Sequence, residues 1–158
     1  MSISVLDHIT ALLEQSNITY KALHHEPTRT SEDSARVRNE ELSIGAKAIV
    51  MKVDKTFQLF VISAAKKIDS KEIKKIFGAK KLRFATADEL MELTSLVPGA
   101  VPPFGKPVFD LDLYVDQSVF NNERVAFNAG SLTDSIIMKS ADYQRLAKPQ
   151  IINFAARE

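Results

Sequence analysis

The segment KAIVMKVDKTFQLFVIS, residues 47–63, decides how this chain folds. Two runs of mostly apolar residues flank Asp54-Lys55-Thr56, and successive side chains before this turn alternate between two faces with the period of a strand. The segment therefore predicts a β-hairpin with largely buried strands. Gly45 precedes the first strand and marks the end of a loop.

Short helices and further strands are expected on both sides of this hairpin. Apolar spacing and helix-capping residues, including Thr86 with Glu89, predict helices at 5–16, 30–38, 70–77, 86–93 and 141–146. Alternating or β-branched runs predict strands at 18–23, 82–85, 108–115, 124–128, 135–138 and 150–154. Helices and strands mix without a regular βαβ alternation, so the sequence predicts one α+β domain over residues 1–158.

The composition excludes several kinds of chemistry. The 158 residues contain no cysteine, which excludes disulfides, thiolate catalysis and cysteine-ligated zinc, and which fits the cytoplasm. Only three histidines occur, so a metal site built from several histidines is not expected. No apolar run is long enough to span a bilayer, and residues 1–16 lack the features of a signal peptide. We therefore expect no metal, no cofactor and no membrane contact.

Charge is concentrated in one segment. The whole chain has a net charge of +1, whereas residues 66–81, hereafter the basic segment, carry a net charge of +5. A basic patch of this kind can bind a phosphate backbone, although a solvated helix face is an equally good interpretation. The lysines concerned are Lys66, Lys67, Lys71, Lys74, Lys75, Lys80 and Lys81.

Three places on the chain could carry chemistry. Lys47 begins a buried strand, where a lysine either reaches solvent or holds its charge beside a cleft. Residues 96–106, LVPGAVPPFGK, form a stiff apolar loop, hereafter the Pro/Gly loop, which either packs on itself or presents backbone amides to a ligand. Residues 127–131, FNAGS, have the composition of a turn and could also line a small pocket. His25 is either a general base or simply surface.

Four segments in this order resemble the YbaK/prolyl-tRNA-synthetase-associated domain family, the freestanding relatives of the editing domain of bacterial prolyl-tRNA synthetase. They are HHEPTRTSEDSARVR (24–38), LSIGAKAIVMK (42–52), LVPGAVPPFG (96–105) and FNAGSLTDSIIM (127–138). The resemblance extends over about residues 24–146. It implies a mixed, mainly antiparallel sheet flanked by short helices, and a hydrolase that deacylates mischarged aminoacyl-tRNA without a metal.

The resemblance also implies roles for individual residues. Lys47 would contact the phosphate or ribose of the terminal adenosine, and the amides of Gly99, Ala100 and Val101 would position the aminoacyl carbonyl. Relatives are thought to use the substrate's own ribose hydroxyl to help activate water. The substrate would be bound by His25, by Pro102, Pro103 and Phe104, and by Phe127, Asn128, Ala129, Gly130 and Ser131. The basic segment, on the ground of its charge rather than of the resemblance, would bind the tRNA.

The substrate implied is a tRNA acceptor end carrying a small amino acid such as Ser, Thr, Ala or Cys. The FNAGS turn lacks the Lys-Arg and His-Pro of other family members, and the polar Asn128 and Ser131 favour an amino acid with a hydroxyl group. The alternative is a catalytically silent module of the same fold that binds tRNA or a nucleotide. Whether an aminoacyl-tRNA synthetase also binds, and how many copies associate, is left open.

Overall fold

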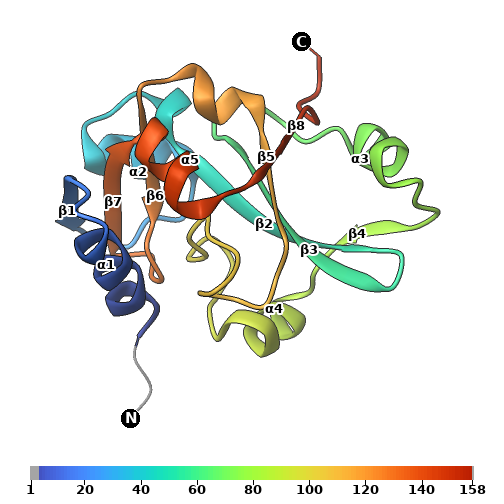
Figure 1. The fold of residues 1–158 in the computed structure, drawn as a ribbon, viewed down its shortest axis with the longest axis horizontal. Helices are drawn as coiled ribbons and strands as arrows, with labels where there is room; N and C mark the ends of the chain where they lie inside the picture. Colours follow the sequence, from blue (N-terminus) through green and yellow to red (C-terminus); the bar gives the residue numbers. More distant parts are fainter. Residues whose placement is uncertain (1–3, 158) are drawn as a thin grey trace.

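The chain forms two β-sheets surrounded by short helices in a computed structural model that describes residues 4–157 (Figure 1). The first sheet has the strand order β1-β7-β6 and is antiparallel, with β1 at Tyr20–His24, β6 at Arg124–Asn128 and β7 at Asp134–Lys139. The second sheet has the order β4-β2-β3-β5-β8. Its strands are β2 (Ala46–Val53), β3 (Thr56–Ser63), β4 (Leu82–Phe84), β5 (Leu113–Asp116) and β8 (Gln150–Ile152).

The predicted hairpin is confirmed as the antiparallel pair β2–β3, which runs from the middle of the molecule to its right-hand end in Figure 1. Val53 pairs with Thr56, so Asp54 and Lys55 form the turn, and Asp54 adopts a left-handed φ of 54°. The Asp54 carboxylate accepts hydrogen bonds from the backbone N–H groups of Lys80 and Lys81, each at 2.9 Å. This turn is thereby tied to the end of the basic segment.

The five expected helices are confirmed. They are α1 (Val5–Gln15), α2 (Ser31–Arg38), α3 (Ser70–Phe77), α4 (Ala87–Thr94) and α5 (Ser140–Ala147), with short 3-10 turns at Leu42–Ile44 and Gln117–Asn121. The capping box of α4 is formed, since Thr86 Oγ1 accepts from the Glu89 N–H at 3.1 Å and Glu89 Oε1 accepts from the Thr86 N–H at 2.9 Å. Figure 1 places α3 and α4 on opposite sides of the hairpin.

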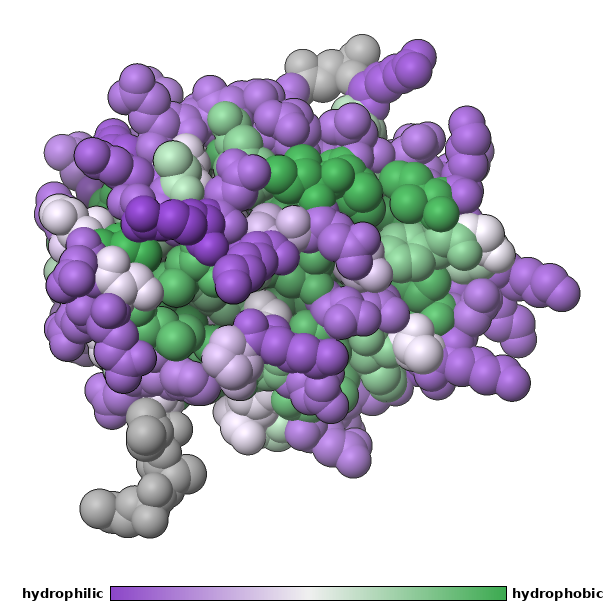
Figure 2. Space-filling view, in the orientation of Figure 1, coloured by the Kyte–Doolittle hydropathy of each residue, from purple (hydrophilic) through white to green (hydrophobic). Residues whose placement is uncertain are grey.

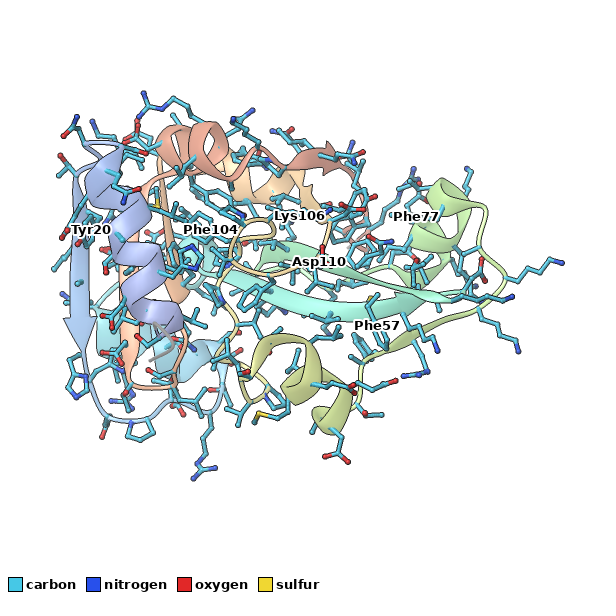
Figure 3. The ribbon with its side chains drawn as sticks, turned by 60° about the horizontal axis from the view of Figure 1, so that its bottom comes forward. Tyr20, Phe57, Phe77, Phe104, Lys106 and Asp110 are labelled. Carbon is cyan, nitrogen blue, oxygen red and sulfur yellow. The ribbon has the colours of Figure 1, made fainter. Side chains whose placement is uncertain are left out.

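One expected strand is wrong in its first half. Residues 106–111 form a turn and the bend that follows it, and β5 begins only at Leu113. The N–H groups of Val108 and Phe109 both donate to the carbonyl of Gly105, at 2.9 and 3.0 Å, which curls the chain before the strand can begin. Figure 3 shows this loop with Lys106 and Asp110.

Two apolar cores hold these elements together, and the α+β prediction is confirmed. The larger core includes Phe104, whose ring meets those of Phe127 and Tyr143 edge-on at centroid distances of 5.6 and 5.4 Å. The smaller core surrounds Phe60, between the hairpin and α3. Within residues 4–157, no helix has the length and apolar character needed to cross a membrane.

Candidate active site

A cavity of about 340 Å³ lies between α2, the start of β2 and the Pro/Gly loop. One wall consists of residues 28–31 with Ser34 and Arg38, and a second consists of residues 45–49 with Ala64. Pro98, Gly99, Val101, Asn128 and Leu132 complete it. The cavity therefore joins segments that are up to about a hundred residues apart in the chain.

The wall of this cavity is positively charged. It includes Arg29, Arg38 and Lys47, whereas none of the described residues that line it is an aspartate or a glutamate. Cations without neighbouring carboxylates attract an anionic or electron-rich ligand, and the effect grows when low-dielectric walls surround them. The wall is therefore suited to a phosphate, a carboxylate or a polarised carbonyl group.

Lys47 lies on this wall, as the interpretation of a charge held beside a cleft requires. It is half-buried on β2, and its Nζ donates to the backbone carbonyl of Lys66 at 3.2 Å. An ammonium group has three N–H donors, so this bond fixes its position and leaves donors for a ligand. The same bond connects the cavity to the first residue of the basic segment.

The Pro/Gly loop contributes Pro98, Gly99 and Val101 to the cavity. The backbone N–H groups of residues 99–101 differ in whether they have a hydrogen-bond partner. The Ala100 N–H donates to the carbonyl of Val97 at 3.1 Å, so the loop itself uses this donor. Among residues 4–157, no partner accepts from the N–H of Gly99 or of Val101. Two of the three amides predicted to position a carbonyl are therefore unpaired within the described residues, and the third is not.

The second half of the loop belongs to the core. Pro102, Pro103 and Phe104 are buried and do not line the cavity. The fully buried Tyr143 donates from its hydroxyl to the carbonyl of Pro103 at 2.6 Å. The loop is thus both a packed structural segment and a wall of the cavity, and these three residues affect a ligand only by holding Gly99 and Val101 in place.

The FNAGS turn brings one residue to the cavity, Asn128. Phe127 and Ala129 are fully buried in the core. Gly130 has a φ of 96°, and a Cβ there would lie 3.0 Å from Val5 Cβ, so packing against α1 requires glycine. Ser131 donates to Asp134 Oδ2 at 2.7 Å, away from the cavity.

His25 and Asp134 stand behind the cavity rather than in it. His25 Nε2 lies 2.8 Å from the hydroxyl of Ser135, a buried residue of β7. A hydrogen bond from His24, together with that from Ser131, keeps the pKa of Asp134 below its ordinary value. The structure therefore gives His25 no direct contact with a ligand in the cavity.

Arg38 is a buried residue of this site that the sequence did not reveal. Its side chain, only 7% exposed, lines the cavity from the last turn of α2. Its Nε donates to Ser135 Oγ at 2.9 Å and its Nη2 donates to Asn128 Oδ1 at 3.0 Å. Burial lowers the pKa of Arg38 to about 10, so the group stays charged at neutral pH.

Two hydroxyl groups on the same wall were also missed. Thr28 and Ser34 are buried and line the cavity, and Ser34 Oγ donates to Thr28 Oγ1 at 2.9 Å. Ser34 and Arg38 are four residues apart on α2, so they share one helix face. This spacing was the available signal, because α2 has few apolar residues and must bury polar ones.

The lysines of the basic segment lie outside the cavity wall. All of them except Lys66 are exposed, and α3 carries Lys71, Lys74 and Lys75. Figure 2 shows hydrophilic side chains projecting at the right-hand end, where Figure 1 places α3 and the hairpin turn. The segment therefore forms a separate charged surface that starts next to Lys47.

Comparison with known proteins agrees with this arrangement. Residues 25–146 match the family model of the aminoacyl-tRNA editing domain. The Escherichia coli K12 protein "Multifunctional Ser/Thr-tRNA deacylase ProXp-y" is 34% identical over 151 residues, which cover 92% of this chain and 90% of that protein. The prolyl-tRNA editing protein ProX of Acetoanaerobium sticklandii is 25% identical, with coverage of 100% and 99%.

A similar fold is known from crystallography. The crystal structure of a candidate trans-editing enzyme for prolyl-tRNA synthetase superposes with a TM-score of 0.83 at 23% identity, over 99% of this chain and 100% of that one. The fold is that of an editing domain. The chain belongs to the aminoacyl-tRNA editing domain family, as the four sequence segments predicted.

Proposed function

We propose that this protein is a trans-editing deacylase that hydrolyses the ester of mischarged aminoacyl-tRNA, with seryl and threonyl esters as its preferred substrates. The observation that carries the proposal is the cavity in which Lys47, Asn128 and the unpaired amides of Gly99 and Val101 meet. Family membership and 34% identity to a Ser/Thr-tRNA deacylase support the reaction class. One domain over residues 1–158 carries the activity, in the cytoplasm where aminoacyl-tRNA is used.

The proposed arrangement divides the substrate between the mouth and the interior of the cavity. Lys47 binds the phosphate or ribose of the terminal adenosine. The amides of Gly99 and Val101 orient the ester carbonyl. An aminoacyl ester is already activated, so positioning and electrostatic stabilisation are sufficient for hydrolysis by water. No protein nucleophile is required.

The hydroxyl groups of Thr28 and Ser34 support the preference for serine and threonine. They replace Ser131 in the expected role, because Ser131 is bonded to Asp134 outside the cavity. A site built to hydrogen-bond a hydroxyl group rejects an analogue without it far more strongly than an apolar pocket distinguishes one methylene. Seryl esters should therefore be hydrolysed faster than alanyl esters on the same tRNA.

We further propose that hydrolysis needs no metal ion. Within residues 4–157, no three His, Asp or Glu side chains lie close enough together to hold one. Exhaustive dialysis against a chelator should leave the rate of the wild-type protein unchanged. A rate that falls, and returns on addition of a divalent cation, would contradict this part of the proposal.

The test is hydrolysis of a panel of purified tRNAs carrying Ser, Thr, Ala or Cys. We expect hydrolysis of the seryl and threonyl members and slower or no hydrolysis of the others. Equal rates for seryl- and alanyl-tRNA would contradict the proposed preference. Binding of tRNA without hydrolysis of any member would instead support the silent binding module.

A further inference from the structure

Arg38 is an unusual charge for a protein interior. Its guanidinium is hydrogen-bonded only to neutral oxygen atoms, Ser135 Oγ and Asn128 Oδ1, and it forms no ion pair with the other described residues. Arginines this deeply buried are ordinarily paired with a carboxylate, since a desolvated charge is costly. The missing negative charge is therefore to be sought in a ligand.

One edge of the guanidinium is available for such a ligand. The Nη1 atom makes no hydrogen bond to residues 4–157, and it is not among the fully buried polar atoms that lack a partner, so it is not sealed in the core. A Cβ on Gly45, itself a wall residue, would lie 3.6 Å from Nη1. Nη1 thus lies beside the second wall of the cavity, at Gly45 just before β2.

The three cationic side chains that line the cavity differ in how deeply they are buried. Arg29 is exposed, Lys47 is half-buried and Arg38 is buried. A phosphate, which is strongly hydrated, fits the exposed and half-buried cations. The acyl group of an ester is uncharged before reaction and enters the interior at little cost. Negative charge that develops there is stabilised most strongly by a buried, preorganised cation.

We propose that Arg38 contacts the substrate, donating from Nη1 to the carbonyl oxygen of the aminoacyl ester and stabilising the negative charge that this oxygen acquires. This inference rests on the proposed deacylase function and adds a catalytic residue to it. The oxygen of water forms a bond to the carbonyl carbon, and the electron pair of the C=O bond moves to the oxygen facing Arg38. That pair then reforms the C=O bond, the bond to the ribose oxygen breaks, and a proton derived from water reaches that oxygen.

Two neighbours hold the guanidinium in place. Asn128 fixes Nη2, and Ser135 fixes Nε. The single hydrogen of the Ser135 hydroxyl can donate to His25 Nε2 at 2.8 Å or to Asn128 Oδ1 at 3.3 Å. In either orientation Ser135 Oγ accepts from Arg38 Nε. His25 and Ser135 are positioning residues in this arrangement.

The experiment compares wild type with Arg38→Lys and Arg38→Ala on seryl-tRNA under single-turnover conditions. A matched measurement records binding of a seryl-tRNA analogue whose ester is replaced by a stable amide. For Arg38→Ala we expect the rate constant to fall about 10²–10³-fold, as for loss of one oxyanion donor, while affinity for the analogue changes only a few-fold. The rate constant of Arg38→Lys should be intermediate, because lysine keeps the positive charge but lacks the planar, forked set of N–H donors. Added guanidinium ion should restore part of the Arg38→Ala rate.

Several outcomes would overturn the proposal. Loss of analogue affinity with an unchanged rate constant would make Arg38 a ground-state binding group. Loss of only the preference for seryl over alanyl esters would show that Arg38 recognises the hydroxyl group of the seryl side chain. If both Arg38 variants fail to fold, Ser135→Ala decides: an unchanged rate constant contradicts the proposal, and a fall of about 10-fold with unchanged affinity supports it. Failure of wild type to hydrolyse any aminoacyl-tRNA would instead contradict the deacylase function itself.

Discussion

Asn128 holds Gly99 of the Pro/Gly loop, donating from Nδ2 to the Gly99 carbonyl at 2.8 Å. The other end of the same amide accepts from Arg38 at 3.0 Å. One side chain therefore fixes the relative positions of the α2 wall and the loop that faces it. This side chain therefore links the loop amides and the Arg38 guanidinium, the donor groups proposed to meet at the ester carbonyl.

Replacing Asn128 with alanine should separate these walls. We expect the rate of seryl-tRNA hydrolysis to fall by about 10²-fold, because a displacement of about 1 Å costs that much in a positioned site. The control is Asn122→Ala, which removes a comparable bond from an amide to the Ser43 carbonyl at 3.0 Å outside the cavity. Equal rates for the two variants, measured on folded protein, would show that Asn128 has no special importance.

Tyr143→Phe tests whether the core anchors the Pro/Gly loop. The change leaves the buried carbonyl of Pro103 without its partner, so the free energy of unfolding should fall by about 1–3 kcal/mol. Chemical denaturation measures this directly. Tyr20→Phe is the control, since it removes a hydroxyl bonded to the exposed Glu14 and should change stability by less than about 1 kcal/mol. Similar losses in both variants would contradict the anchoring role.

Charge reversal on α3 tests the basic segment. Changing Lys71, Lys74 and Lys75 to glutamate should weaken tRNA binding and reduce the dependence of log affinity on log salt concentration by up to about 3, one for each phosphate that a lysine no longer neutralises. Hydrolysis of a short aminoacylated CCA end should not change. A matched triple reversal of the exposed Lys21, Lys139 and Lys148 should leave affinity nearly unaffected. Unchanged affinity in the α3 variant would leave those lysines as a solvated helix face.

Acid stability should depend on the pair formed by Arg83 and Glu89. Two hydrogen bonds from Arg83, at 2.7 and 2.9 Å, lead the causes that lower the pKa of Glu89 from 4.5 to about 2. A lowered carboxyl pKa stabilises the fold above pH 4.5, and this contribution is lost as the pH falls towards 2. Wild type should therefore melt higher than Glu89→Gln at pH 5, and the gap should close by pH 2. A gap that stays constant with pH would refute the assignment.

The local signals in the sequence were sufficient for most of the fold. The hairpin, the capping box at Thr86 and the apolar spacing of α1 are all determined by residues close together in the chain. The strand expected at 108–115 is wrong in its first half, because the partial alternation of these residues does not report the turn that begins at Gly105. Turn hydrogen bonds depend on backbone geometry that periodicity does not report.

The sequence predicted only part of the site, because some of its residues lie in recognisable segments and others depend on contacts between distant parts of the chain. Lys47, Gly99, Val101 and Asn128 belong to segments that resemble the family, and the structure brings all four to one cavity. Arg38 was missed because the helix SEDSARVR reads as a solvated surface, and its burial depends on packing against Ser135 and Asn128, about 90 to 100 residues away. Phe104 and Phe127 were assigned to the pocket, but apolar side chains beside it were needed to fill the core.

The most direct measurement is the rate of seryl-tRNA deacylation by Lys47→Ala beside Lys52→Ala. Both lysines lie on β2, but only Lys47 lines the cavity, while Lys52 lies over the ring of Phe57. We expect Lys47→Ala to lose most of the wild-type activity, about 10²-fold or more, while Lys52→Ala keeps it and both remain folded. A Lys47→Ala protein that hydrolyses seryl-tRNA at the wild-type rate would contradict the assignment of this cavity as the active site.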